Sequence, residues 1–240
     1  MRTVKSQAGY SMTEVLISTA LGGIILAGVF DLYITSSNSI LGQTNTVQMQ
    51  TDAKAAMNFM AKELQLMNGP PTINANGDAV TFIRVRDSGY SSGGNTVSTL
   101  WDASKNWTPN VYAPTADGAY SVKIILGGGV GEIHPLKGNT ATTLTLADTD
   151  TWTAIPDETS LYFIYLNKTF TRLPDNTLRY QIEGGPLRLL AANIIDMEFK
   201  LNASDPYATD ITMIAQTQNK DPRTGQYGRY TLTQTIRRRN

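Results

Sequence analysis

A single carboxylate lies near the start of an otherwise apolar stretch of the chain. Residues 9–30 read GYSMTEVLISTALGGIILAGVF, and Glu14 is the only charged side chain among them. An ionised side chain in hydrocarbon costs roughly 3 kcal/mol or more, so such residues are rare there and usually have a partner. Glu14 is therefore the residue of this stretch that is most able to direct a specific interaction.

The start of a helix offers Glu14 one role. Ser11 and Glu14 have the spacing of a capping box, in which both side chains satisfy free N–H groups of the first helical turn. Capping alone would explain the glutamate in any helix. A second interpretation depends on a family resemblance described below, and the two are compatible.

Two further motifs have the residue types for metal or phosphate binding. His134 is the only histidine; it stands beside Pro135 in a turn-like region, so we expect a bystander rather than a metal ligand. The glycines of residues 127–131 follow a predicted strand, but Pro135 prevents a helix from opening directly after them. We therefore predict a turn between strands and not a phosphate-binding loop.

Two acidic pairs and one basic run are the remaining candidates for binding residues. The pairs Asp148/Asp150 and Asp205/Asp210 do not fit a twelve-residue calcium loop, which favours solvated turn acids. The run of arginines at 237–239 is either a solvated strand end or a contact with a neighbour, membrane headgroups or DNA. Because no nucleophile, base and acid form a set, we predict no enzyme, cofactor or metal, and nucleic acid is not an expected partner.

The composition suits an exported domain with an anchor. The 240 residues are enough for one domain and a membrane segment, and the basic and acidic residues balance at 20 each. The absence of cysteine excludes disulfides and cysteine-based metal or redox chemistry. With only 17% charged residues, the chain favours a strand-rich exported domain over a cytosolic helical enzyme.

The N-terminal region predicts a membrane-spanning helix. Arg2 and Lys5 precede the apolar segment, and no further basic residue occurs before Lys54, which predicts a cytoplasmic N-terminus. Residues 10–30 would span about 31 Å as a helix, close to one hydrocarbon thickness. An ordinary secretory signal with a cut before Gly28 is the alternative.

The same helix is predicted to continue well beyond the membrane. Residues 31–67 contain no proline and only Gly42, and the sequence NGPP at 68–71 ends the helix after about 57 residues, near 85 Å. Between the apolar and amphipathic parts, residues 35–52 are polar, which suits packing among other copies or passage through a wet gap. An apolar stripe at steps of three or four marks the last third: Met49, Ala53, Ala56, Met60, Leu64 and Met67.

These features together resemble the class III signal of type IV pilins and their relatives. The basic leader ends at Gly9, an aromatic residue follows at Tyr10, and Glu14 is the fifth residue after the glycine. The resemblance implies cleavage between Gly9 and Tyr10 by a prepilin peptidase, methylation of the Tyr10 amine, and pairing of Glu14 with such an amine during subunit assembly. Polar Thr13 stands where an aliphatic residue is usual.

Within that family, the chain is most similar to PilW-like minor pilins. It is also similar to their relative, the J-type minor pseudopilin of type II secretion. Residues 52–64 and the C-terminal strand patterns carry this resemblance, whereas residues 72–155 match no family pattern. The lack of a helix proline and of cysteine favours a minor subunit over a major one. The implied role is a structural subunit that primes, caps or joins a pilus, held in the inner membrane before assembly.

The resemblance implies a set of partners and a domain plan. Other pilins, the prepilin peptidase/methyltransferase, the inner-membrane assembly platform and the membrane are the expected partners. Residues 1–9 would be a removed leader, 10–33 a membrane and filament-core helix, 34–68 its amphipathic half, and 69–240 a β-rich domain. A secreted surface-binding β domain remains the alternative from another class.

Strand patterns after residue 71 complete an α+β fold in which antiparallel strands pack on the amphipathic half of the helix. The loop-rich insert near 87–119 carries two tryptophans and is either a mobile surface loop or a packed insert. Eight strands are predicted, at 79–86, 120–126, 142–147, 161–167, 177–182, 194–201, 210–217 and 229–237.

Overall fold

The computed structural model describes residues 11–205 and 207–239, so Gly9 and Tyr10 lie outside the described residues. Internal contacts divide the chain into two compact units. One comprises Met1–Gln48 with Thr217–Gly228, and the other comprises Met49–Gln216 with Arg229–Asn240.

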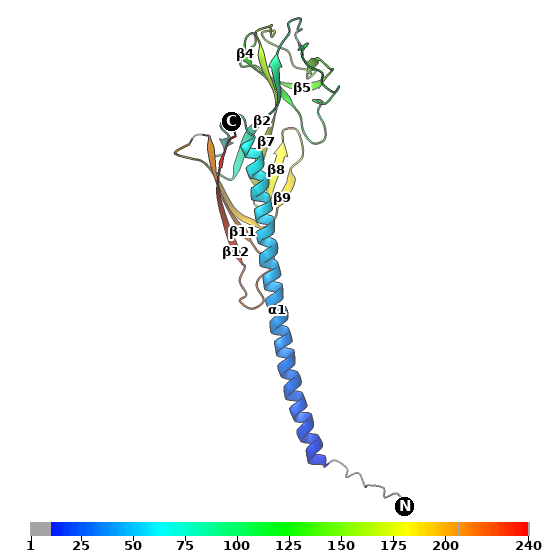
Figure 1. Cartoon of the computed structure of the whole chain (residues 1–240), viewed down its shortest axis with the longest axis vertical. Helices are drawn as coiled ribbons and strands as arrows, with labels where there is room; N and C mark the ends of the chain where they lie inside the picture. The colour runs from blue at the N-terminus through cyan, green and yellow to red at the C-terminus, as the bar shows by residue number, and fades with distance from the viewer. Residues whose placement is uncertain (1–10, 206, 240) are drawn as a thin grey trace, which may run out of the picture. The chain divides into compact units, whose positions relative to one another are not determined.

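One long helix, α1 (Met12–Gln65), begins the described chain (Figure 1). It ends three residues before the expected boundary at Asn68. The Leu66 and Met67 amides donate to the carbonyls of Glu63 and Leu64, three residues back, which tightens the last turn. The Asn68 amide then donates to Ile83 of the sheet at 2.8 Å and draws the chain away from the helix axis.

Two long strands, β2 (Ala79–Tyr90) and β7 (Leu161–Arg172), pair antiparallel along their whole length. On the other side of β7, β4 (Ser121–Leu126) pairs with its first half and β8 (Leu178–Ile182) with its second half. The nine-stranded sheet is completed by β1 (Thr72–Ile73), β3 (Thr99–Trp101), β5 (Ile133–Asn139), β6 (Thr143–Leu146) and β9 (Arg188–Ala191).

A second sheet is a three-stranded antiparallel meander. Its strands are β10 (Ile194–Leu201), β11 (Ala208–Gln216) and β12 (Arg229–Arg237). These strands lie along one side of the C-terminal part of α1, and β8 and β9 lie along another (Figure 1). This part of the helix is therefore enclosed by both sheets.

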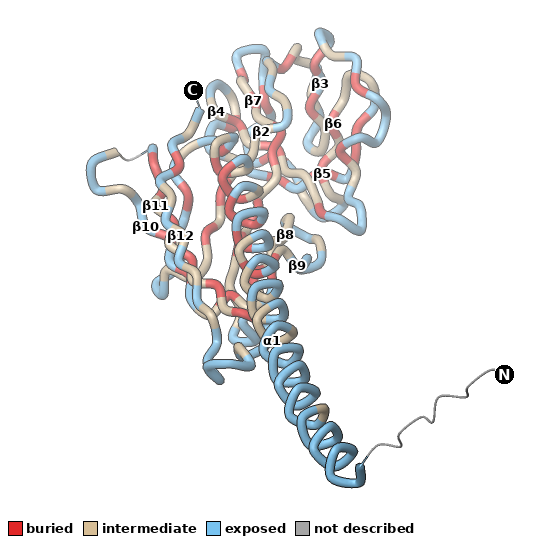
Figure 2. Tube along the Cα trace, turned by 60° about the horizontal axis from the view of Figure 1, so that its bottom comes forward, coloured by how far each residue is buried: buried red, intermediate tan, exposed pale blue. Residues whose placement is uncertain are grey.

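The first core forms where the helix meets the two sheets. Met60 and Leu64 of α1 are fully buried against Phe82, Phe170 and other apolar side chains of both sheets. The stripe predicted from the sequence supplies the helix side of this core, and its buried positions are visible along α1 in Figure 2. The expected α+β fold, an N-terminal helix packed on antiparallel sheets, is confirmed.

The second core lies at the other end of the β2–β7 pair. Its members come from β3 to β7, from the segment between β3 and β4, and from the loop between β6 and β7. The insert at 87–119 supplies Leu100, Trp107 and Tyr112, all of which are buried, so the segment is packed. The full set is Leu100, Trp107, Tyr112, Val122, Ile124, Leu136, Leu144, Leu146, Trp152, Tyr162 and Ile164.

All eight predicted strand segments are strands in the structure, six of them with shifted ends, but four strands were not predicted. The most instructive is β5, because Pro135 led us to expect a turn there, and that prediction was wrong. Proline cannot donate a ladder hydrogen bond, but its carbonyl accepts one from Ala147 at 2.9 Å. A bulge between Leu136 and Gly138 follows directly and accommodates the irregular strand.

Candidate assembly site on the N-terminal helix

The first turn of α1 contains Glu14 in a partly formed capping box. Ser11 precedes the helix, and its amide donates to a Glu14 carboxylate oxygen across 3.4 Å. The serine hydroxyl bonds to the Thr13 hydroxyl at 2.6 Å, while the Glu14 amide donates to the Ser11 carbonyl at 2.9 Å. One long hydrogen bond from the backbone leaves the exposed carboxylate with capacity for a stronger donor.

Around this carboxylate the helix surface is apolar and exposed. Leu16, Ile25 and Phe30 each expose more than 60% of their surface. The helix is long and apolar enough to cross a membrane, and no residue of its most apolar 18-residue stretch is buried within the chain. Exposure of so much apolar surface to water is unfavourable, so lipid or neighbouring helices must cover it.

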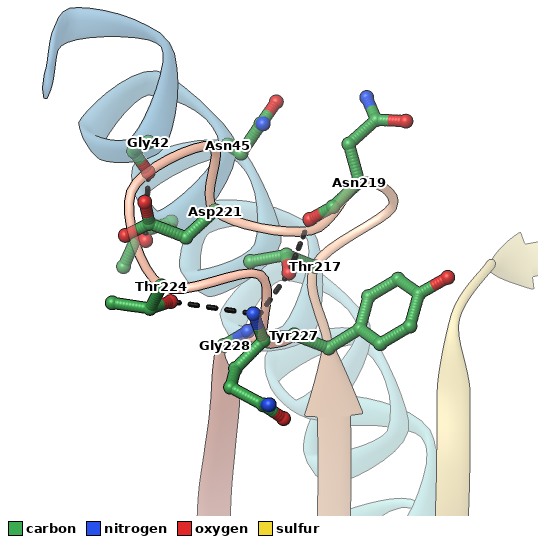
Figure 3. A pocket seen from close by; sticks show the side chains of 10 residues that line it. Gly42, Asn45, Thr217, Asn219, Asp221, Thr224, Tyr227 and Gly228 are labelled. Atoms are coloured by element: carbon green, nitrogen blue, oxygen red, sulfur yellow. Dashed lines mark hydrogen bonds between the residues drawn. The ribbon is translucent and has the colours of Figure 1, made fainter. Parts of the chain in front are cut away.

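The polar middle of the helix has a cover within its own unit. Gly42, Asn45 and Thr46 line a recess of about 110 Å³ with residues of the loop Thr217–Gly228 (Figure 3). A side chain at Gly42 would start 3.4 Å from the Asp221 carboxylate, so glycine lets the loop approach the helix closely. The polar residues there thus contact a polar loop of the same chain, which the sequence did not predict. Packing among other copies or passage through a wet gap stays a prediction.

The loop holds its shape through its own hydrogen bonds. Thr217 and Gly228 are joined twice, because the Thr217 amide donates to the Gly228 carbonyl at 2.9 Å and the Gly228 amide donates to the Thr217 hydroxyl at 3.0 Å. The Asp221 amide donates to the Gln226 carbonyl at 2.8 Å. The loop therefore reaches the helix as an ordered segment rather than as an extended linker.

The only histidine lies in β5 and is buried between two carboxylates. His134 Nε2 is 3.0 Å from Glu132 Oε2, and its Nδ1 is 3.2 Å from Asp150 Oδ2, although the alignment at Nδ1 does not make a hydrogen bond. The ring also meets Trp152 edge-on at 4.6 Å between centroids. Among the described residues, no group of three acidic or histidine side chains has the arrangement of a metal site.

Glu132 connects this cluster to the following loop. Its carboxylate accepts the amides of Thr153 at 2.9 Å and Ala154 at 2.8 Å. Burial disfavours the charged form, but hydrogen bonds from His134 and these two amides outweigh it, so the pKa of Glu132 lies below its usual value. The cluster fastens a loop to β5.

The acids weighed as calcium ligands bond to neighbours in their own chain. Asp148 pairs with Lys137 at 2.5 Å, and Asp205 pairs with Arg237 at 2.9 Å. Asp210 lies in β11, where it accepts hydrogen bonds from Asn202 and Thr235.

The terminal arginines and the glycine-rich segment also have structural surroundings. Arg237 belongs to β12, and the Arg238 guanidinium lies 4.8 Å from the centre of the Tyr207 ring. Residues 127–131 connect β4 to β5, and Gly127 and Gly129 have positive φ angles of 82° and 77°. The predicted turn between strands is confirmed.

The second core contains a buried polar network that was not predicted from the sequence. Asp102 exposes 1% of its surface and accepts a 2.6 Å hydrogen bond from the Tyr162 hydroxyl. Nearby, Asp87 accepts hydrogen bonds from Trp107 at 2.6 Å and Lys105 at 2.9 Å. The bonded pairs lie up to 60 residues apart in the sequence, so no local spacing marks them.

Comparison with protein families finds that residues 4–30 match the prokaryotic N-terminal methylation motif. Searches of curated proteins and of solved structures found no match. The matched stretch contains Gly9, Tyr10 and Glu14 and most of the apolar segment, which indicates a type IV pilin-like or pseudopilin-like protein with a class III signal. Together with the apolar helix, the motif fits a protein anchored in the inner membrane and later incorporated into the pilus.

Proposed function

We propose that this protein is a minor type IV pilin of the PilW-like kind, a non-enzymatic subunit that primes, caps or joins a pilus. The observation that carries the proposal is the methylation motif at the start of a helix whose most apolar stretch has no buried residue. A helix of this kind can leave the bilayer only if other helices replace the lipid. Packing among subunits in a filament supplies that replacement.

In this proposal the prepilin peptidase removes residues 1–9 by cutting after Gly9, and the new Tyr10 amine is methylated. Residues 10–33 anchor the subunit and later enter the filament core, residues 34–68 continue the helix, and residues 69–240 remain outside the membrane. The assembly platform and the other pilins are the partners. Priming or capping needs one or a few copies, which suits a minor subunit.

Glu14 gives assembly a specific contact. A carboxylate in a region of low dielectric is stabilised strongly by an opposite charge and poorly when alone. The positively charged Tyr10 amine, of the same or a neighbouring subunit, is the partner that cleavage creates. The single 3.4 Å bond from Ser11 leaves room for that partner.

Mass spectrometry of the mature N-terminus tests the processing step. A chain that begins with methylated Tyr10 is the expected result. A mature chain that begins near Gly28 would instead indicate a secreted surface-binding domain with a conventional signal peptide, and it would overturn the proposal.

Replacement of Glu14 tests the assembly contact. We expect Glu14→Ala to leave membrane insertion intact and to reduce recovery of the subunit with sheared pili or with cross-linked pilins by about tenfold. Asp31→Ala is the matched control, because Asp31 is also an exposed acid on α1. Normal incorporation of Glu14→Ala would show that the carboxylate mainly caps its own helix.

A minor pseudopilin of a type II secretion system is the second candidate, because the matched motif indicates pilins and pseudopilins alike. Deletion separates the two roles. Loss of surface pili supports the first candidate, whereas loss of protein secretion with normal pili supports the second.

A further inference from the structure

A recess of about 240 Å³ lies on one face of the nine-stranded sheet, between the two cores. Even-numbered residues of β7 share this face, since side chains alternate along a strand. Ile164 belongs to the second core and Phe170 to the first, while Leu166 and Lys168 between them line the recess. The recess is therefore the part of this face that neither core fills.

Three cations line the recess, and two of them share one carboxylate. Glu63 of α1 lies 2.7 Å from Arg84 Nη1 and 2.8 Å from Lys168 Nζ. Arg84 donates hydrogen bonds from Nη1 to both carboxylate oxygens of Glu63. Its Nε and Nη2 make no hydrogen bond to another described residue. The recess thus keeps a surplus of positive charge and free guanidinium donors.

Arg86 is the third cation, and it lies at a β-bulge. Val85 pairs with Tyr165 and Asp87 with Ile164, so Arg86 is the extra residue in β2. Bulges of this kind re-aim side chains and often lie beside functional sites. Arg86 is exposed and forms no ion pair with any residue in the described part of the chain.

The remaining lining is aromatic and aliphatic. Tyr120, Leu166 and Ile182 are half-buried and complete the recess. Tyr120 is held edge-on against Tyr112 at 5.3 Å between ring centroids. A ligand here would meet guanidinium and ammonium groups together with an apolar surface fit for the C–H face of a ring.

We propose that this recess binds an acidic sugar unit, with its carboxylate or phosphate on Arg86 and Arg84 and its ring against Tyr120. The volume suits a single residue rather than a drug-sized ligand. An extended peptide would need a free strand edge for main-chain bonds, but β2 and β7 are paired along the recess. Three clustered cations in a chain of zero net charge do not form the stripe that nucleic acid requires.

Titration calorimetry on the full-length protein in a detergent without sugar groups tests the proposal. The probes are methyl β-glucuronide, glucose 6-phosphate and neutral methyl β-glucoside. We expect binding of one or both anionic sugars and at least about tenfold weaker binding of the neutral sugar, since ionic hydrogen bonds are the stronger ones. The two anionic probes distinguish a uronic acid from a sugar phosphate.

Matched variants locate the binding. Arg86→Gln should weaken binding of the anionic sugar at least about tenfold, and Tyr120→Leu should weaken it several-fold. Arg229→Gln, at an exposed arginine of β12, should leave affinity and thermal stability unchanged. Unchanged affinity in Arg86→Gln, equal binding of methyl glucoside, or N-acetylglutamate binding as tightly as the sugars would each overturn the proposal.

Discussion

At the scale of single residues, three carboxylates show how surroundings decide what a charge can do. Asp102 is buried and receives donors from Tyr162 and Ser104. Glu63 holds two cations. Glu14 is exposed and has one long hydrogen bond. Of the three, Glu14 is the one with capacity left for an external partner.

Removal of the Tyr162 hydroxyl should destabilise the second core. Tyr162→Phe deprives the buried Asp102 carboxylate of a 2.6 Å donor and should lower the free energy of unfolding by about 1.5–3 kcal/mol, as for hydrogen bonds to charged groups. Urea denaturation followed by tryptophan fluorescence measures the change. Tyr90→Phe, at an exposed tyrosine of β2, is the control and should have no effect beyond about 0.5 kcal/mol.

Glu132 should make stability depend on pH in the acid range. Its folded pKa lies below the unfolded value of 4.5, so its contribution is fully present above that pH and is lost as pH falls through the folded pKa. The stability advantage of the wild type over Glu132→Gln should therefore shrink as the pH falls below 4.5 and through the lowered folded pKa. The charged neighbours of this carboxylate are His134, whose Nε2 lies 3.0 Å from it, and Asp150, which lies on the other side of the imidazole ring.

The control for Glu132 is Asp148→Asn, because Asp148 forms an exposed pair with Lys137. Such pairs contribute little, so this variant should follow the wild type at every pH. A stability difference between wild type and Glu132→Gln that grows toward low pH would contradict the assignment.

The residues of the candidate assembly site could be named from the sequence because their signal is local. Ser11, Glu14 and the apolar run stand within one stretch of sequence. The Asp102–Tyr162 hydrogen bond and the recess around Arg86 could not be predicted from the sequence, because they depend on which strands pair and on a bulge in β2. His134 was expected in a turn for a local reason, the adjacent Pro135, and the two flanking strands overrode it.

At the scale of elements, periodicity predicted the helix and the longer strands. The stripe from Met49 to Leu64 is buried because its spacing gives one face, which both sheets cover. β1, β3 and β9 have two to four residues each, too few for an alternating pattern to be recognised. Their place in the sheet comes from the neighbours they pair with.

The end of α1 offers a direct comparison between burial and exposure. Leu64→Ala should cost about 2–5 kcal/mol, because the side chain is fully buried in the first core and its loss leaves a cavity. Leu66→Ala removes the same atoms from a side chain that is 49% exposed and should cost much less. Thermal and urea unfolding of the two variants measure the difference, and similar losses would contradict the assignment of the first core.

At the scale of the folded unit that holds both cores, the β2–β7 pair connects them. β7 contributes Tyr162 and Ile164 to the second core and Phe170 to the first. Its pairing with β2 is continuous except at the single bulge at Arg86. Loss of either core would leave half of this strand pair unsupported, so the two cores should stabilise each other.

We therefore expect the two cores to unfold together. All three tryptophans, Trp101, Trp107 and Trp152, lie in the half of the unit that contains the second core, so their fluorescence follows that core. Met60→Ala weakens only the first core, yet it should lower the urea midpoint measured by tryptophan fluorescence as much as the midpoint measured by far-UV circular dichroism. A fluorescence midpoint that stays at the wild-type value would show that the second core folds independently and that the strand pair transmits no stability across the recess.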